Sequence, residues 1–304
     1  MQECYFAGYR MLVDDEISEH ESMLRLSTFR KEMPYTHTFT VRMGDEALLD
    51  EKYVESQGYT PLFSTEDLAF YDAGDTWRIV RILNERALEN HMKNVVIASK
   101  DYGEMTVYML NEPFYWERGG QWIRPIVPFS SSVRAICEAG MVMRGGLPLH
   151  ASLVEKDGQG IVFLGPSGMG KSTQAKLWVA HQNADFIIGD RPVLRCIDGT
   201  WHGFGMPWDG KDNIKNQKTV PIRALVSLKQ AGENSIERLT EQQAMLVLLK
   251  QAMMPMWDNR AMESAMALMG RLAMDIPFYH LKNLPDKNAT DITYRAVFEG
   301  KDHG

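Results

Sequence analysis

The sequence predicts a mixed α/β fold, in which a β-rich N-terminal domain precedes a domain that combines helices with β-hairpins. Three observations support this prediction. Short β-type runs separated by turn residues fill the first 140 residues, Asp-Gly turns separate two later pairs of runs, and a glycine-rich loop joins an apolar run to a helical stretch. We expect an accessory or substrate-recognition domain over residues 1–140 and a second domain over residues 141–304.

The composition limits the classes of protein to consider. With 304 residues, of which 44% are hydrophobic, the chain can form a substantial core, either as two domains or as one large one. The formal net charge of −7 argues against general nucleic-acid binding, which normally depends on clustered lysines and arginines. We therefore expect no nucleic-acid partner.

Cysteine usage and hydropathy indicate the compartment. Cys4, Cys137 and Cys196 are widely spaced and form no C-x-x-C pair, so neither a disulfide framework nor a cysteine zinc site is expected. No apolar stretch approaches the length of a membrane span, and the N-terminal residues become acidic early. These features predict a soluble, cytoplasmic protein without a membrane partner.

The N-terminal domain is expected to contain a mostly antiparallel sheet. Its β-type runs are separated by Gly, Asp and Asn, and they include residues 38–43, 68–71, 77–83 and 105–110. The aromatic cluster FYWERGGQW, residues 114–122, is expected to pack between strands rather than to form a recognition surface. Residues 130–150 open with serines that suit helix capping, and they predict a helix that ends before Gly145 and Gly146.

Two β-hairpins are expected in the second domain, because Asp-Gly suits a tight turn between antiparallel strands. The runs and their turns are 151–154 with 161–164 around Asp157-Gly158, and 193–197 with 201–204 around Asp198-Gly199. Doubly wound nucleotide-binding folds instead alternate parallel strands with crossover helices. The second domain should therefore contain a mixed sheet.

The stretch GPSGMGKST, residues 165–173, matches the phosphate-binding pattern G-x-x-x-x-G-K-[ST] between the apolar run 161–164 and a predicted helix over 173–181. Its glycines let backbone N–H groups approach an anion closely, and the helix adds its positive dipole end. Lys171 supplies a mobile positive charge, and Ser172 offers a hydroxyl to Mg²⁺. The expected nucleotide-binding residues are Gly165, Pro166, Ser167, Gly168, Met169, Gly170, Lys171, Ser172 and Thr173.

An acidic residue follows the next buried β-type run. Asp190 comes after residues 186–188, and the end of this run should lie beside the glycine-rich loop. A carboxylate at this edge can hold Mg²⁺ directly or through water. The alternative is an Asp that only begins a turn at the end of a strand.

The remaining elements surround this core. The chain continues with a β-type run at 224–228, a helix from the capping box TEQQ at 240–243 through about 254, a helix over 258–274, a run at 278–281 and a last helix from about 289. Pro255 should end the first of these helices. The methionines of the second suit core packing or a subunit interface better than a metal site, so a homo-oligomer is among the expectations.

Residues 203–218, GFGMPWDGKDNIKNQK, have weak apolar periodicity and are expected to form a loop over the site. Lys211, Lys215 or Lys218 could meet an acceptor molecule, and Asp209 could act as a base. A solvated surface loop is the alternative.

The stretches LHASLVEKDGQGIVFLGPSGMGKSTQAKLW and ADFIIGDRPVLRCIDGTWHGFGMPW resemble the HPr kinase/phosphorylase family, whose core is shared with ATP-dependent phosphoenolpyruvate carboxykinase. The resemblance covers roughly residues 145–300 and implies a P-loop kinase core that binds ATP and Mg²⁺. It assigns catalytic roles to Asp190, His150 and Lys171, and metal binding to Ser172 and Asp190. The alternative for His150 is a ring that only satisfies a backbone hydrogen bond.

Two functions remain open at this point. The first is an ATP-dependent kinase that phosphorylates a Ser-type hydroxyl of a peptide, protein or small molecule. The second is a nucleotide-binding regulator or assembly protein without transferase activity, because Gly189 stands where the bifunctional enzymes have a first of two acids. A generic P-loop ATPase or GTPase fits less well, since Asp190 follows Lys171 by only 19 positions and hairpins flank the loop.

Overall fold

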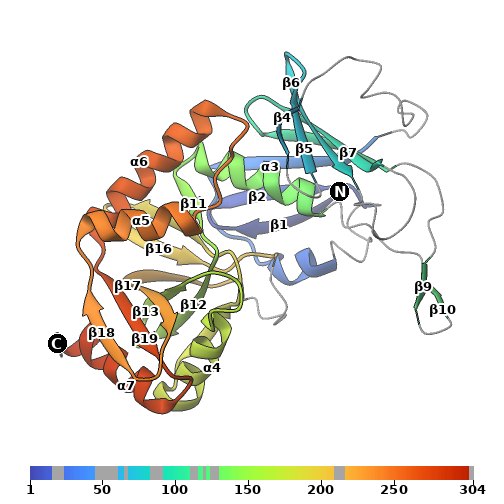
Figure 1. Cartoon of the computed structure of the whole chain (residues 1–304). Coiled ribbons are helices and arrows are strands. Elements are labelled where there is room, and N and C mark those ends of the chain that lie inside the picture. The colour runs from blue at the N-terminus through green and yellow to red at the C-terminus, as the bar shows by residue number, and fades with distance from the viewer. Residues whose placement is uncertain are drawn as a thin grey trace. The chain divides into compact units, whose positions relative to one another are not determined.

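The computed structural model in Figure 1 describes residues 1–15, 24–44, 61–64, 68–82, 92–109, 116–118, 121–123, 130–208 and 216–300. Internal contacts divide the chain into two compact units. The first unit comprises Met1–Gly140 and Pro255–Asn259, and the second comprises Met141–Met254 and Arg260–Gly304. Helices and mixed sheets occur together, so the predicted mixed α/β class is confirmed.

The first unit contains a sheet whose strand order, within the described residues, is β1-β2-β3-β8-β7-β6-β5-β4. The strands are β1 (Gln2–Phe6), β2 (Tyr9–Val13), β3 (His37–Met43), β4 (Pro61–Ser64), β5 (Leu68–Asp72), β6 (Thr76–Ile82), β7 (Met92–Ser99) and β8 (Glu104–Met109). Strand β3 pairs in parallel with β2 and β8, whereas the other neighbours are antiparallel. The prediction of a mostly antiparallel sheet is therefore confirmed.

Smaller elements complete this unit: the 3-10 helix η1 (Leu24–Phe29), a ribbon of β9 (Trp116–Arg118) and β10 (Gln121–Ile123), and helix α3 (Ser130–Val142). The rest of the predicted aromatic cluster at 114–122 lies outside the described residues. Helix α3 lies close to the sheet, because a Cβ atom on Gly140 would meet the Phe39 ring at 2.7 Å.

The second unit contains a mixed sheet with the order β11-β15-β16-β17-β13-β12-β14. Strand β19 adds to β17, and β18 adds to β19. The strands are β11 (Gly146–Pro148), β12 (Ala151–Lys156), β13 (Gln159–Leu164), β14 (Asp185–Ile188), β15 (Val193–Ile197), β16 (Thr200–Phe204), β17 (Thr219–Gln230), β18 (Ser235–Arg238) and β19 (Phe278–Asn283). Strand β17 is parallel to β13 and β19, and the other pairs are antiparallel.

Both predicted hairpins are confirmed. Strands β12 and β13 are joined by Asp157 and Gly158, with φ values of 52° and 76°, and β15 and β16 by Asp198 and Gly199, with 48° and 81°. Positive φ at both central residues is what a two-residue type I′ turn requires, and Asp-Gly provides it at low cost.

The helices of the second unit are α4 (Lys171–Gln182), α5 (Glu241–Gln251), α6 (Asn259–Asp275) and α7 (Lys287–Tyr294), which continues into the π-helical turn η3 (Arg295–Glu299). Helix α5 begins with the predicted capping box between Thr240 and Gln243. It ends at Gln251 rather than near residue 254, because the next residues pair with the chain before β12: Ala252 bridges Leu149, and the Met253 N–H donates to the Pro148 carbonyl at 3.0 Å.

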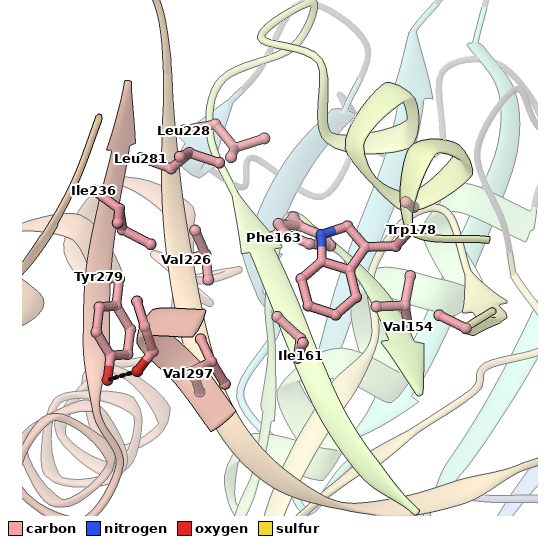
Figure 2. Packing of buried hydrophobic residues seen from close by; sticks show 14 of the residues in the cluster. Val154, Ile161, Phe163, Trp178, Val226, Leu228, Ile236, Tyr279, Leu281 and Val297 are labelled. Carbon is pink, nitrogen blue, oxygen red and sulfur yellow. Dashed lines mark hydrogen bonds between the residues drawn. The ribbon is translucent and has the colours of Figure 1, made fainter. Parts of the chain in front are cut away.

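One face of this sheet carries the apolar core shown in Figure 2. Alternate residues of neighbouring strands, including Ile161, Phe163 and Val226, face the fully buried Trp178 of α4. The Trp178 ring lies 6.0 Å from that of Phe163 between centroids. Because burial of a large aromatic side chain contributes several kcal/mol, on the order of 3–5 by truncation, this contact fixes α4 against β13.

The methionines of α6 do not act as one group. Met269 is fully buried, whereas Met266 and Met274 are among the exposed apolar side chains.

Among the described residues, no helix is both long and apolar enough to cross a membrane.

Candidate functional site

The residues between β13 and α4, 165–170, form a turn that we call the glycine loop. Gly168 and Gly170 have φ values of 79° and 100°, which side-chain-bearing residues rarely adopt, and a Cβ atom on Gly168 would meet nothing within 4 Å. The loop is held from β17, because the Gln230 amide donates to the Gly168 carbonyl at 3.2 Å. The strand, loop and helix follow one another as predicted.

Lys171 begins α4 and folds back over this loop. Its Nζ donates to the carbonyl oxygens of Gly165 at 2.7 Å and of Pro166 at 3.2 Å. The residue is only 8% exposed. Burial lowers the pKa of the Lys171 ammonium, and the Asp190 carboxylate acts in the opposite direction.

His150 lies beside the loop because of the strand register. Ala151 pairs with Leu164, so the residue before β12 comes next to the residue after β13. The backbone N–H of His150 donates to the Gln251 carbonyl at 2.7 Å, which fixes the main chain from α5. Its Nε2 lies 3.2 Å from Lys171 Nζ. Since an ammonium can only donate, Nε2 accepts, and the neutral ring carries its proton on Nδ1.

The electrostatic surroundings keep the His150 ring neutral. Burial lowers its pKa below the ordinary value of 6.5, and the positive charges of Lys171 and Arg191 lower it further, while Asp190 opposes them. The ring is therefore expected to carry no charge at pH 7.

Asp190 follows β14 and completes a row of three polar groups. Its Oδ1 lies 3.9 Å from His150 Nε2, and its Oδ2 lies 3.8 Å from Arg191 Nε. The turn that carries it is anchored by Ser152, whose hydroxyl donates to the Gly189 carbonyl at 2.9 Å. Within the part of the chain that the structure describes, Asp190 Oδ1 is buried and has no hydrogen-bond partner.

The structure thus brings Lys171, His150 and Asp190 together at the end of the glycine loop. The other predicted residues surround them: Ser172 is half-buried, and Pro166, Ser167 and Thr173 are exposed. Sequence reasoning missed Arg191 and Gln230. An arginine directly after a candidate acid was a usable signal, whereas Gln230 reaches the loop only through the parallel pairing of β17 with β13.

The predicted loop at 203–218 contributes no described residue to this row. Asp209, Lys211 and Lys215 lie outside the described residues. Lys218 pairs with Asp185 at 2.7 Å and with Glu155, and these hydrogen-bonded carboxylates raise its pKa. Asp185 begins β14 whereas Asp190 follows its end, so Lys218 belongs to the opposite end of that strand.

The side chains present fit a phosphate chain and a hard cation. The glycine loop offers backbone N–H groups and a neighbouring ammonium. The buried Asp190 Oδ1, which has no hydrogen-bond partner in the described part of the chain, is the type of ligand that Mg²⁺ takes. No group of three or more His, Cys, Asp or Glu side chains in the described ranges could hold a metal ion alone. A cation here would need further oxygen ligands, such as those of a nucleotide.

Comparison with known proteins identifies a family. Residues 122–283 match the family described as "SynChlorMet cassette protein ScmC". The chain belongs to this family. The part that matches the ScmC family includes His150, the glycine loop, Lys171 and Asp190.

Other comparisons add little. No curated protein matches the chain. The solved structures that resemble it include the HPr(Ser) kinase/phosphatase from Coxiella burnetii, with 12% sequence identity and a TM-score of 0.29, covering 50% of this chain and 93% of that chain. Membership of this ScmC-family protein in the HPr kinase family stays a prediction from its sequence.

Proposed function

We propose that this ScmC-family protein is an ATP- and Mg²⁺-dependent kinase with a P-loop kinase core, which transfers the γ-phosphoryl group of ATP to a hydroxyl group. The observation that carries the proposal is the row Lys171, His150 and Asp190 beside the glycine loop, in which one carboxylate oxygen is buried and has no hydrogen-bond partner among the described residues. The acceptor is a peptide, a protein or a small molecule with a Ser-type hydroxyl.

The glycine loop would hold the phosphates of ATP. Lys171 now donates to the loop's own carbonyl oxygens, and these bonds are exchanged for phosphate oxygens when a nucleotide binds. Ser172 and Asp190 would hold Mg²⁺, which would neutralise charge on the phosphates. The protein's part is to orient the phosphates and to keep their charge compensated.

Phosphoryl transfer then needs an acceptor oxygen in line with the γ-phosphorus. The hydroxyl oxygen forms the new bond to phosphorus, the bond between the γ-phosphorus and the bridging oxygen breaks, and the electron pair stays with ADP. Asp190 would take the hydroxyl proton. The neutral His150 ring, 3.9 Å from this carboxylate, would orient it.

Gly189 supports a second candidate function. It leaves the end of β14 with one acid, and its carbonyl only anchors the turn through Ser152. A site with a single carboxylate also suits a regulator or assembly protein that binds nucleotide and transfers nothing.

A thermal-shift titration with MgATP tests nucleotide binding. Wild type should gain stability by mass action, and Lys171→Ala should gain much less because it lacks the charge contact to the phosphates. Lys176→Ala, an exposed lysine on the same helix, is the matched control and should behave as wild type. Equal stabilisation of all three proteins would remove the glycine loop from the nucleotide site.

Labelled ATP separates the kinase from the regulator. Proteins and peptides encoded beside the gene are the candidate acceptors, and each is incubated with wild type and Asp190→Asn. If the Asp190 carboxylate serves as base, the transfer rate of the variant should fall by about a hundredfold or more while appreciable nucleotide binding is retained. If wild type labels no acceptor although it binds MgATP, the regulator function stands instead.

A further inference from the structure

The backbone of Arg191 adopts an unfavourable conformation next to the candidate acid. Its φ is 56°, in the left-handed region that residues with a Cβ atom rarely occupy. The following Pro192 restricts Arg191 further, because a residue before proline favours extended conformations. In the described part of the second unit, the other non-glycine residues with positive φ lie in hairpin turns or at a helix end: Asp157, Asp198 and Asn183.

Hydrogen bonds at both ends of the turn maintain this conformation. At one end the Ser152 hydroxyl donates to the Gly189 carbonyl at 2.9 Å, and at the other the Leu149 N–H donates to the Pro192 carbonyl at 3.1 Å. Both donors come from the segment that carries His150. The turn is therefore fixed to residues on both sides of His150. Strain that the surroundings hold in this way is typical of functional positions.

The Arg191 side chain belongs to the same electrostatic environment as the row of three. Its Nε lies 3.8 Å from Asp190 Oδ2, which is an ion-pair distance and longer than a hydrogen bond. The cations of Lys171 and Arg191 thus lie in the same small region as the Asp190 carboxylate.

We propose that Arg191 is a further catalytic residue, whose guanidinium binds the phosphoryl group in transit between ATP and the acceptor hydroxyl. This inference rests on the proposed kinase function. As the bond from phosphorus to ADP breaks and the bond to the acceptor oxygen forms, negative charge spreads over three phosphoryl oxygens. A guanidinium is permanently charged, and its planar fork of N–H donors matches such oxygens. The strained backbone holds this fork beside Asp190.

A transition-state analogue tests the inference without knowledge of the acceptor. The affinity for MgADP is measured with and without aluminium fluoride, which occupies the position of the phosphoryl group. In wild type, aluminium fluoride should tighten MgADP binding about tenfold or more. Arg191→Asn keeps a residue that tolerates positive φ and removes the charge. It should bind MgADP within about twofold of wild type and lose most of the tightening.

Two further variants serve as controls. Arg271→Asn, on the surface of α6, removes an arginine of the same unit and should keep the full tightening. Arg191→Gly removes the side chain without backbone strain, so it should fold at least as stably as Arg191→Ala and lose the tightening like Arg191→Asn.

The possible failures are distinguishable. If wild type does not bind MgADP, the proposed kinase function fails together with the inference. If wild type binds MgADP without tightening by aluminium fluoride, or if Arg191→Asn keeps the tightening, the inference is wrong while nucleotide binding stands. An equal loss of MgADP affinity with and without aluminium fluoride would make Arg191 a residue that holds the nucleotide itself, which also overturns the inference.

Discussion

At the scale of single residues, the candidate site consists of groups whose charges depend on one another. His150 Nε2 lies 3.2 Å from Lys171 Nζ and 3.9 Å from Asp190 Oδ1, so the ring stands between the ammonium and the carboxylate. A neutral imidazole between a cation and an anion accepts from the first and keeps its proton on the nitrogen that faces neither. The His150 ring is therefore expected to carry one proton, on Nδ1.

This arrangement predicts the titration of His150. The pKa of its ring should lie below 6.5, because burial and the Lys171 charge disfavour the protonated form. Lys171→Met removes that charge and should raise the His150 pKa, whereas Lys176→Met should leave it unchanged. An NMR titration of the imidazole Cε1–H signal measures both values. An unchanged pKa in Lys171→Met would contradict the contact between the two side chains.

The sign of the linked effect on stability follows from the same shift. When the folded-state pKa is lowered, the unfolded chain binds the proton first as the pH falls. His150 therefore costs no stability above pH 6.5 and costs progressively more as the pH drops from 6.5 through its lowered folded-state pKa.

At the scale of elements, the site forms where one loop, one turn and one strand end meet. The glycine loop follows β13, the turn at residues 189–192 follows β14, and His150 precedes β12. Strand β12 pairs with both β13 and β14, so it holds the loop and the turn on either side of its own start. The geometry of the site thus depends on the central position of β12 in this part of the sheet.

Local sequence patterns are sufficient to predict part of this arrangement. Asp-Gly turns predict both hairpins, and the glycine pattern between a β-type run and a helix predicts the loop. The pairing of β14 with β12 joins residues 30 or more positions apart, and nothing local specifies it. The contact between Ser152 and Gly189 follows from that pairing, and so does the approach of Asp190 to His150.

The end of α5 is a second feature that local sequence patterns do not predict. Pro255 suggests a stop near residue 254, and residues 252–254 are compatible with a helix by propensity. The helix stops at Gln251 because the chain there pairs with residues 148–150, including the bond from the His150 N–H to the Gln251 carbonyl. Tertiary hydrogen bonds thus override local preference, and they also fix the main chain of a site residue.

Ser152 gives the element-scale prediction. Ser152→Ala removes the donor to the buried Gly189 carbonyl, and leaving such an acceptor unsatisfied costs about 1–3 kcal/mol. Ser235→Ala on the exposed edge of β18 is the control and should change stability by less than about 0.5 kcal/mol. Hydrogen exchange of the β12 and β14 amides measures the difference. Equal exchange in the two variants would mean that the turn is held without Ser152.

At the scale of the whole molecule, the chain passes between its two units more than once. After α5 it contributes Pro255–Asn259 to the first unit before α6 begins. The Trp257 ring stacks on Phe70 with centroids 4.0 Å apart, and the Tyr102 hydroxyl donates to Asp258 at 2.8 Å. A division by sequence at residue 140 gives no sign of this return, because the partners lie more than 150 positions away.

The last prediction concerns the hydrogen bond from Tyr102 to Asp258, which joins the returning segment Pro255–Asn259 to the rest of the first unit. Tyr102 is fully buried and Asp258 nearly so, and a hydrogen bond to a charged group contributes about 1.5–3 kcal/mol. Tyr102→Phe should therefore destabilise the first unit by that amount, whereas Tyr35→Phe, at an exposed ring, should have little effect. Peptide-resolved hydrogen exchange should show faster exchange in β5 to β8 of Tyr102→Phe and unchanged exchange in β12 and β13. Acceleration of both sheets to the same extent would mean that the two units unfold as one cooperative body, in which Tyr102 stabilises the sheet that carries the glycine loop as much as its own sheet.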